Sequence, residues 1–265
     1  LLTFLKKIPE CTHAELAGSY RRGKETVGDL DILVLSPKAK VIMDAFTSLK
    51  DVETILSYGN TKSSVRFHNG LQVDLRVLKK ENYGAALQYF TGSKEHNVEL
   101  RKRAVKQGYT LNEYGLSSLQ SQKIIAGKTE KELYEKLGMQ YIPAEMRENK
   151  GEIQRAQKHR IPSLLRQKDI HGDFQTQTLW SDGRHSIEEM ARYAQSLGWT
   201  FLTITDHVGG IGIVHPLDEK RLQKQAQEID ALNKKLEIHI FKGAEIDITK
   251  NGELALSQKA CKELD

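Results

Sequence analysis

The sequence predicts an α/β protein built of two units. Short apolar strands alternate with helices along the chain, and Asn69-Gly70 is a hairpin turn between two of the strands. The composition changes after a charged segment that contains two prolines. We expect a first unit over residues 1–147, a linker over 148–168 and a second unit over 169–265.

The first unit is predicted to combine a sheet with helices. Leu30–Leu35 is an apolar run typical of a buried strand, and the apolar spacing over Lys38–Lys50 predicts a helix. Ser93 is the expected N-cap of a basic helix that extends to Gln107. Thr129 and Glu132 form a capping-box pattern at the start of another helix. Further strands are expected at Val52–Ser57, Ser63–His68, Gln72–Leu78 and Tyr109–Asn112.

Strands and helices alternate in the second unit as well, after a first strand that leads into Ser181. The clearest helix is Ser186–Leu197, which opens with a Ser186/Glu189 capping box. Three or four strands are few for a closed barrel, so we expect this unit to be incomplete. Because the chain also lacks an initiator methionine, we expect it to begin inside a longer protein. The other elements are expected at Thr200–Thr205, Asp218–Lys235, Glu237–Phe241 and Ala244–Ile248.

Composition excludes several classes of protein. No apolar run approaches the roughly 18–20 residues that a membrane span requires, and the N-terminus has no secretory-signal pattern. Cys11 and Cys261 are the only cysteines, which excludes a disulfide scaffold and a cysteine-based zinc site. We therefore expect a cytoplasmic protein with no membrane partner, and a monomer.

The charge is distributed unevenly along the chain. Residues 1–168 contain 29 Lys and Arg against 19 Asp and Glu (net +10), whereas residues 169–265 contain 11 against 16 (net -5). A basic region favours a polyanionic partner, because lysine and arginine neutralise phosphates and release counterions. A solvated basic surface is the alternative interpretation of the charge alone.

Three carboxylates are the most informative residues. Asp29 and Asp31 are two positions apart on a predicted strand, so their side chains leave on the same face. Asp74 lies in another predicted strand between apolar residues and is expected to point at the same site. Carboxylates this close repel each other unless a cation lies between them, and hard oxygen ligands suit Mg²⁺ or Mn²⁺. The pattern predicts a two-metal site of the kind used for phosphoryl transfer.

A glycine-containing turn precedes the first two aspartates. Gly18-Ser19 offers backbone N–H groups and a hydroxyl to phosphate oxygens. Arg21 and Arg22 add bidentate positive charge that suits a polyphosphate. A turn followed by a polar strand start is the alternative, but the three aspartates together favour a phosphate site.

These segments resemble the palm signature of the family X DNA polymerases, within the nucleotidyltransferase superfamily. The resemblance starts from Gly18–Gly23 and Gly28–Val34. Later segments are similar in the same order, and the resemblance extends over essentially the whole chain. These later segments are Tyr89–Ser93, Asn97 with Arg101, Leu111–Leu116 and Tyr141–Glu148. The implied fold is an α+β nucleotidyltransferase palm with helical thumb additions.

The resemblance also implies residue roles. Asp29, Asp31 and Asp74 would be catalytic and would hold two Mg²⁺ or Mn²⁺ ions. Residues implied at the incoming dNTP are Gly18, Ser19, Arg22, Tyr89, Phe90, Gly92 and Asn97. Ser19 and Arg22 would contact the β- and γ-phosphates, Tyr89 and Phe90 the sugar, and Asn97 the base. Arg101 would contact the template side. Independently of the resemblance, the cations of its helix, which include Lys94 and Lys102, predict a DNA-facing surface, with a solvated helix face as the alternative.

The second unit resembles the PHP (polymerase and histidinol phosphatase) domain of bacterial members of this family. That domain carries a His-x-His metal motif, and here both positions are glutamine, Gln175 and Gln177. A neutral amide is a poorer ligand than imidazole for Zn²⁺ or Mn²⁺. His207 and Glu245 remain as isolated ligand candidates, so we expect a degenerate, truncated PHP-type α/β barrel unit without its metals and without nuclease activity.

Three functions are therefore open at this point. The first is a template-directed DNA polymerase that adds dNMP from dNTP to a primer 3′-hydroxyl, as in short-gap filling during DNA repair. The family's N-terminal helix-hairpin-helix domains have no counterpart in this sequence, so we expect weak, salt-dependent DNA binding. The second is a template-independent nucleotidyltransferase, and the third is a non-catalytic DNA-binding remnant.

Overall fold

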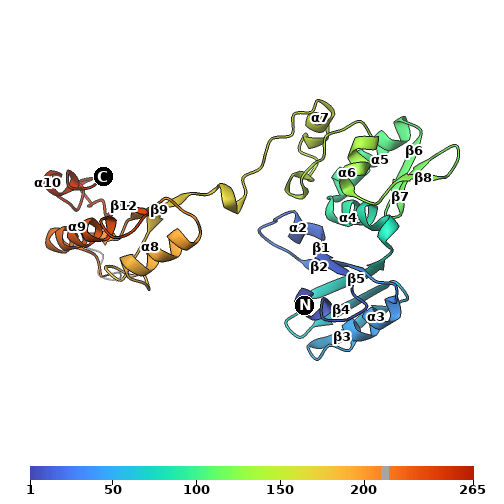
Figure 1. The fold of residues 1–265 in the computed structure, drawn as a ribbon, viewed down its shortest axis with the longest axis horizontal. Coiled ribbons are helices and arrows are strands. Elements are labelled where there is room, and N and C mark those ends of the chain that lie inside the picture. The colour runs from blue at the N-terminus through green and yellow to red at the C-terminus, as the bar shows by residue number, and fades with distance from the viewer. Residues whose placement is uncertain (210–214) are drawn as a thin grey trace. The chain divides into compact units, whose positions relative to one another are not determined.

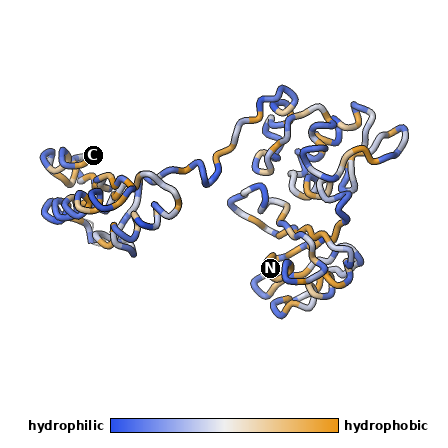
Figure 2. The backbone as a smooth tube through the Cα atoms, viewed as in Figure 1, coloured by the Kyte–Doolittle hydropathy of each residue, from blue (hydrophilic) through white to orange (hydrophobic). Residues whose placement is uncertain are grey.

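The computed structural model describes residues 1–209 and 215–265 as two compact units. Unit 1 comprises residues 1–162 and unit 2 residues 163–265 (Figure 1). Apolar residues concentrate on the strands of each unit, whereas many turns are hydrophilic (Figure 2).

A five-stranded sheet forms the first half of unit 1. Its order is β1-β2-β5-β4-β3, with β2 and β5 parallel and the other neighbouring strands antiparallel. The strands predicted near residues 30, 52, 63 and 72 are confirmed, whereas β1 was not predicted. The strands are β1 (His13–Leu16), β2 (Asp29–Leu35), β3 (Val52–Tyr58), β4 (Lys62–Phe67) and β5 (Gln72–Leu78).

The two faces of this sheet differ because side chains alternate along each strand. One face contributes Ile32 and Val34 of β2 and Val73 and Leu75 of β5 to an apolar core, together with α1 (Leu2–Leu5) and α3 (Ala39–Thr47). The opposite face carries Leu33, which packs with α4 (Tyr83–Thr91). Toward the start of β2 and β5 that second face is polar and carries the aspartates.

The second half of unit 1 is built from helices and a small antiparallel sheet. The sheet order is β6-β7-β8, and its core includes Leu100, Leu116 and Tyr134. Two helices approach closely at Gly84, where an added Cβ would lie 2.3 Å from the backbone of Thr129. The elements are η1 (Lys80–Asn82), α4, α5 (Lys94–Lys106), β6 (Tyr109–Asn112), β7 (Gly115–Ser118), β8 (Ile124–Ala126), α6 (Glu130–Lys136), η2 (Ala144–Met146) and α7 (Glu152–Gln157).

The predicted helix caps are largely confirmed. The Ser93 side chain accepts a hydrogen bond from the N–H of His96, and that of Thr129 accepts one from the N–H of Glu132. The capping box at Thr129 is only half formed, because the Glu132 carboxylate accepts from the N–H groups of Gly127 and Lys128 instead.

The expected linker over residues 148–168 is too long at its N-terminal end. Ile153 and Ala156 of α7 are 2% and 0% exposed and belong to the core of unit 1. The boundary between the units falls after Pro162. Charged residues surround these two apolar positions, so the sequence pattern of this stretch is typical of a linker although it packs as a helix.

Unit 2 contains a parallel three-stranded sheet of order β12-β10-β9 and a separate parallel pair, β11-β13. Its predicted alternation of strands and helices is confirmed, including the Ser186/Glu189 capping box. The sheet is open in the described part of the chain. The elements are η3 (Gln167–Asp169), β9 (Gly172–Thr176), α8 (Ile187–Ser196), β10 (Phe201–Ile204), β11 (His207–Val208), α9 (Glu219–Asn233), β12 (His239–Lys242), β13 (Glu245–Ile246) and α10 (Gln258–Cys261).

Candidate active site

The strand register of unit 1 brings three aspartates to one face of its sheet. β2 and β5 run parallel, and Asp31 lies directly opposite Asp74. Asp29 is two residues before Asp31 on β2, so all three side chains leave on the same face. The face is the one that α4 covers at its other end through Leu33.

Gly18 approaches Asp31 more closely than any other residue type could. Its φ is +60°, and an added Cβ would lie 2.5 Å from Asp31 Oδ2. Gly18 begins a one-turn helix, α2 (Gly18–Arg21), in place of the open turn that the sequence predicts. The backbone of α2 therefore lies directly against the carboxylate of Asp31, with Ser19 in the same turn.

Asp74 is held by its neighbours in the sheet. Its Oδ1 accepts a hydrogen bond from Gln72 Nε2 at 3.2 Å, and its Oδ2 lies 3.1 Å from Lys62 Nζ on β4. The ammonium group of Lys62 thus supplies a positive charge to this side of the site. This contact draws Asp74 toward β4.

The two facing aspartates have opposite pKa shifts. Burial, and then the charges of Asp29 and Asp74, raise the pKa of Asp31 to about 6. Burial alone would raise the pKa of Asp74 too, but hydrogen bonds from Ser64 and other neighbours, and the charge of Lys62, outweigh burial and lower it. The raised pKa of Asp31 therefore reflects its burial first and the two neighbouring carboxylates second, against the opposing charges of Arg76 and Lys62.

The donor chemistry of this face fits a hard divalent cation. Carboxylate oxygens are the ligands that Mg²⁺ and Mn²⁺ prefer. In the present side-chain conformations, no three acidic, His or Cys side chains of the described residues are close enough to hold one ion. The carboxylates of Asp29, Asp31 and Asp74 thus fit the ion in their chemistry, while Lys62 holds Asp74 in the present conformation.

The expected nucleotide-binding residues lie around the end of α4. Tyr89 and Phe90 form an edge-to-face pair with ring centroids 5.0 Å apart, in the last turn of the helix. The guanidinium of Arg76 lies 4.2 Å from the centroid of Phe90, and that of Arg101 lies 5.9 Å from the centroid of Tyr89. The aromatic pair is therefore flanked by cations from the sheet and from α5.

Asn97 uses its amide to hold the glycine turn. Its Nδ2 donates to the carbonyl oxygens of Tyr89 and Gly92 at 2.7 and 3.1 Å, and its Oδ1 accepts from Gln88. An added Cβ at Gly92 would lie 2.6 Å from Asn97 Oδ1. The amide of Asn97 is buried and fully engaged, so this conformation does not leave it free to contact a base.

The two adjacent arginines at the end of α2, Arg21 and its C-cap Arg22, also have protein partners. Arg22 donates to the carbonyl oxygen of Thr91 at 2.9 Å and to Glu148 Oε1 at 2.7 Å. Arg21 is more deeply engaged, with both terminal nitrogens on Glu130 at 2.8 and 2.9 Å. The prediction that Arg21 serves a polyphosphate is therefore wrong for this structure, since its fork binds a carboxylate of the protein.

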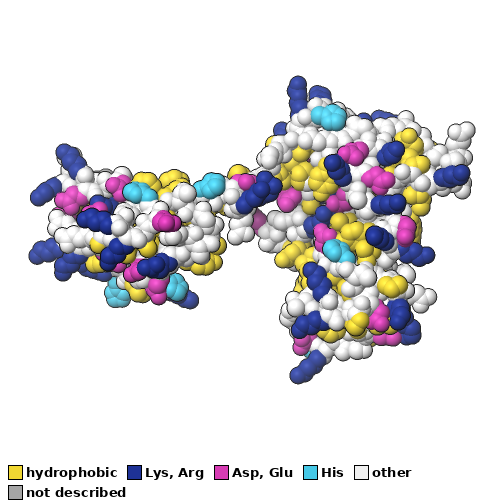
Figure 3. All heavy atoms as spheres, viewed as in Figure 1, with side chains coloured by type: hydrophobic (Ala, Val, Ile, Leu, Met, Phe, Trp, Pro, Cys, Tyr) yellow, Lys and Arg dark blue, Asp and Glu magenta, His cyan; other side chains and the backbone are white. Residues whose placement is uncertain are grey.

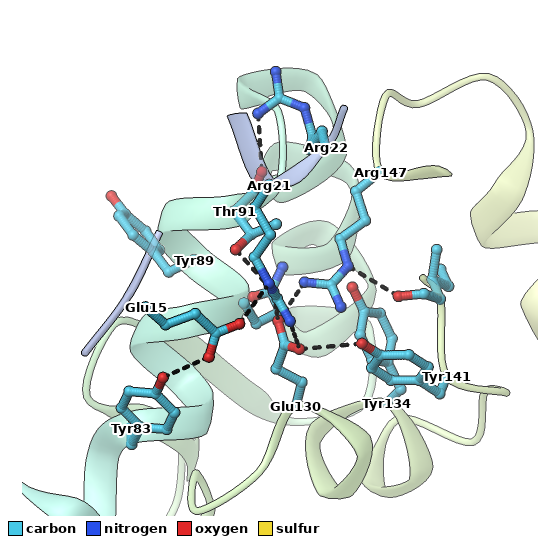
Figure 4. A network of polar contacts seen from close by, with 12 residues as sticks. Glu15, Arg21, Arg22, Tyr83, Tyr89, Thr91, Glu130, Tyr134, Tyr141 and Arg147 are labelled. Carbon is cyan, nitrogen blue, oxygen red and sulfur yellow. Dashed lines mark hydrogen bonds and ion pairs between the residues drawn. The ribbon is translucent and has the colours of Figure 1, made fainter. Parts of the chain in front are cut away.

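Sequence reasoning missed the network that Arg21 belongs to. Glu130, which is 6% exposed, binds Arg21 from α2 and the fully buried Arg147, and Tyr141 donates to it at 3.2 Å (Figure 4). Arg21 Nε also lies 3.1 Å from Glu15. Although burial works against the charged forms, this pairing lowers the pKa of Glu130 and raises those of both arginines. The network joins the two halves of unit 1.

A second buried chain of polar groups was also missed. His96, at the start of α5, is 0% exposed, and its Nδ1 lies 2.6 Å from Glu152 Oε1 of α7. Its Nε2 lies 3.0 Å from the hydroxyl of Tyr134. Burial lowers the pKa of His96 even though Glu152 favours its charged form. No local pattern signals this chain, because its members lie 38 and 56 residues away from His96.

The expected DNA-facing residues lie along α5. Lys94 and Lys102 are exposed, and Arg101 is half-buried against Tyr89. Lys102 lies 3.5 Å from Glu99 on the same helix. Lys94 and Arg101 are seven residues apart and therefore lie on one side of the helix.

The four candidate residues of unit 2 do lie together. Gln175 and Gln177 both donate to Glu245 Oε2, at 2.9 and 3.1 Å. The two ring nitrogens of His207 lie 3.6 Å from Asp182 and 3.9 Å from Glu245. The cluster follows the carboxyl ends of parallel strands, where α/β proteins commonly bind ligands. Here, however, the side-chain amides of Gln175 and Gln177 donate hydrogen bonds to the Glu245 carboxylate that would otherwise face a metal.

Two family models match unit 1. The DNA polymerase beta palm model matches residues 2–82, and the DNA polymerase beta thumb model matches residues 86–148. The sheet with its three aspartates is therefore a polymerase-type palm, and the helical half that follows is a thumb. No helix among the described residues has the length and apolarity needed to cross a bilayer.

Curated relatives agree with these models. The chain is 34% identical over 252 residues to DNA polymerase/3′-5′ exonuclease PolX of Bacillus subtilis, covering 94% of this chain but 44% of that protein. It is 30% identical over 130 residues to Repair DNA polymerase X of African swine fever virus, covering 47% of this chain and 75% of the viral protein. Rat DNA polymerase lambda is 31% identical over 157 residues, which cover 48% of this chain and 27% of lambda. The chain belongs to family X of the DNA polymerases.

Proposed function

We propose that this chain is a template-directed DNA polymerase that adds dNMP from a dNTP to a primer 3′-hydroxyl. The observation that carries the proposal is the register of β2 and β5, which puts Asp31 opposite Asp74 with Asp29 on the same face. The name of the viral relative, Repair DNA polymerase X, supports a role in DNA repair, for which we propose short-gap filling.

The proposed reaction forms a bond between the primer 3′-oxygen and the α-phosphorus and breaks the bond to the β-phosphate, with pyrophosphate as the leaving group. Asp29 and Asp31 would hold two Mg²⁺ or Mn²⁺ ions with the triphosphate, and Asp74 would hold the ion at the primer hydroxyl. When bound, the ions would lower the pKa of that hydroxyl and neutralise charge in the transition state.

The remaining residues of the site would position the substrate. The N–H groups of α2 and the Ser19 hydroxyl would contact phosphate oxygens, and the close approach of Gly18 to Asp31 supports this role. Tyr89 and Phe90 would present an aromatic surface to the sugar, which their edge-to-face pairing supports. Arg22 would reach a phosphate only by exchanging Glu148 and Thr91 for it.

Primer extension on four templates that differ only in the first unpaired base tests this function. We expect each template to direct insertion of its complementary nucleotide, because the palm and thumb surround a template-paired dNTP in the proposed function. Insertion that ignores the template base would support a template-independent nucleotidyltransferase instead. If the wild type incorporates no more nucleotide than an Asp29→Ala/Asp31→Ala double variant, the result would support a non-catalytic DNA-binding remnant instead.

We infer that unit 2, a degenerate PHP-type unit, does not hydrolyse phosphoesters. Glu245 is engaged by the amides of Gln175 and Gln177, and the nitrogens of His207 face two different carboxylates. These side chains do not present a shared set of ligands to one ion. We expect no digestion of single-stranded DNA above background when Mn²⁺ is added, measured on denaturing gels. Digestion that disappears in a His207→Ala/Glu245→Ala variant would contradict this inference.

A further inference from the structure

The end of unit 1 beyond the thumb match carries a fixed basic surface. The thumb model ends at residue 148, whereas unit 1 continues to residue 162. Ile153 and Ala156 hold α7 in the apolar core, and Glu152 lies 2.6 Å from the buried His96. The exposed face of α7 is therefore held in place by both apolar and polar contacts.

The chain turns back at the end of α7, so that Arg160 lies beside the helix. His159 has a φ of +53°, which is uncommon for a residue other than glycine, and the N–H of Arg160 donates to the carbonyl oxygen of Arg155 at 2.9 Å. The next residue is clamped as well, because the N–H of Ile161 donates to the side chain of Gln140 at 2.9 Å. Arg160 is thus fixed beside α7.

Three cations share this surface. Arg155, Lys158 and Arg160 are exposed and, together with Gln154, line a hollow of about 360 Å³. Within the described residues no carboxylate forms an ion pair with any of the three, whereas Arg166 of unit 2 is paired with Asp169. Lys and Arg side chains project from the end of unit 1 where α7 lies (Figure 3).

Stabilisation of α7 by its C-terminal cations does not account for three positive charges at this surface. A cation near a helix C-terminus gains about 0.3–1 kcal/mol from the helix dipole, and α7 has only six residues. Three unpaired cations around one hollow repel each other and hold counterions. Binding of phosphates releases those counterions, which favours a polyanion over an isolated anion.

We propose that Arg155, Lys158 and Arg160 form a second DNA-contact surface of unit 1 that binds backbone phosphates away from the active site. The choice of DNA as the polyanion rests on the proposed polymerase function. The surface would add sequence-independent affinity to a chain whose other expected DNA contacts lie on α5.

The test is the salt dependence of DNA binding by the full chain. Binding is measured by fluorescence anisotropy with a labelled primer–template. An Arg155→Ala/Lys158→Ala/Arg160→Ala variant is compared with Lys220→Ala/Lys224→Ala/Lys235→Ala, which removes three exposed cations from and beside α9. We expect the α7 variant to bind about tenfold or more weakly at low salt. Its slope of log K against log salt should be shallower by about 2–3, since each phosphate contact contributes roughly 0.9.

The control variant should bind like the wild type. Equal affinities and slopes for the α7 variant and the wild type would overturn the proposal, and so would equal losses in both variants. The three side chains are exposed, so the melting temperature should not change; a single Lys158→Glu variant provides a second, less extensive change that should also weaken binding.

Primer extension by the wild type, measured in parallel, separates this inference from the proposed function. If the wild type binds DNA through α7 but does not extend a primer, the polymerase proposal fails and the binding surface stands. If the wild type extends a primer and the α7 variant binds as tightly as the wild type, the surface alone is refuted.

Discussion

Replacement of Asp31 by asparagine is expected to lower nucleotide incorporation by about 10³-fold or more. Asp31 lies opposite Asp74 and two residues from Asp29, and it is one of the two carboxylates that would hold both proposed ions. Loss of one group that stabilises transition-state charge costs about 10²–10³-fold, and loss of a shared metal ligand adds to that. Single-turnover primer extension at saturating primer–template and dNTP measures the effect.

Asp51→Asn is the matched control for this variant. Asp51 is an exposed aspartate of the same sheet region, just before β3, and it is outside the carboxylate face. Its loss removes one negative charge of the same kind and should change incorporation less than twofold. Incorporation by Asp31→Asn within tenfold of the wild type would contradict the catalytic role of Asp31.

The same Asp31→Asn variant should be more stable than the wild type without metal. The pKa of Asp31 is raised from 3.8 to about 6, so the folded chain binds its proton more tightly than the unfolded chain. Its charge therefore destabilises the fold above about pH 6, and this penalty is relieved as the pH falls from about 6 to 4. Urea unfolding should show a gain for the variant at pH 8 that disappears below about pH 4.

Replacement of Glu130 by glutamine should destabilise unit 1 by about 3 kcal/mol at neutral pH. Glu130 is the shared partner of Arg21 and of Arg147, which is 0% exposed. A glutamine keeps the shape but leaves the buried guanidinium of Arg147 without a counter-charge among the described residues, and leaves Arg21 with Glu15 alone. Loss of one partner of a buried ion pair typically costs about 3–5 kcal/mol. Urea unfolding followed by far-ultraviolet circular dichroism measures the loss.

Two controls sharpen this measurement. Glu135→Gln on the same helix alters an exposed pair with Lys131 and should cost less than about 1 kcal/mol. Both tryptophans, Trp180 and Trp199, lie in unit 2, so the transition seen by tryptophan fluorescence should not move with Glu130→Gln. A shift of both transitions, or equal effects of the two glutamates, would contradict the role assigned to Glu130.

The effect of Glu130→Gln should also depend on pH. The folded-state pKa of Glu130 is lowered, so its contribution to stability is complete above its usual pKa of 4.5 and is lost as the pH falls below that value. The difference between wild type and variant should therefore shrink in acid.

Much of the palm sheet could be predicted because its signals are local. Asp29 and Asp31 share a face by simple alternation, and Ser93 and Ser186 are recognisable caps from their neighbours alone. The pairing of Asp31 with Asp74 is different in kind. It depends on which strands lie side by side, and alternation within one strand carries no such information.

The elements that were missed lack a local signal. α4 is buried on most sides and contains Gly84, so it has no polar stripe to mark it as a helix. Glu130 and Arg147 are charged residues, which are usually exposed, and only the fold brings them to Arg21. The amide bonds of Asn97 likewise follow from the path of the chain at Gly92.

The contact between Gly18 and Asp31 leaves evolution little room at position 18. Any larger residue would combine a left-handed backbone with an atom placed 2.5 Å from the carboxylate oxygen. As long as Asp31 is retained, we therefore expect Gly18 not to tolerate substitution. The residue at the start of α2 thus depends on an acidic residue thirteen positions later in the chain.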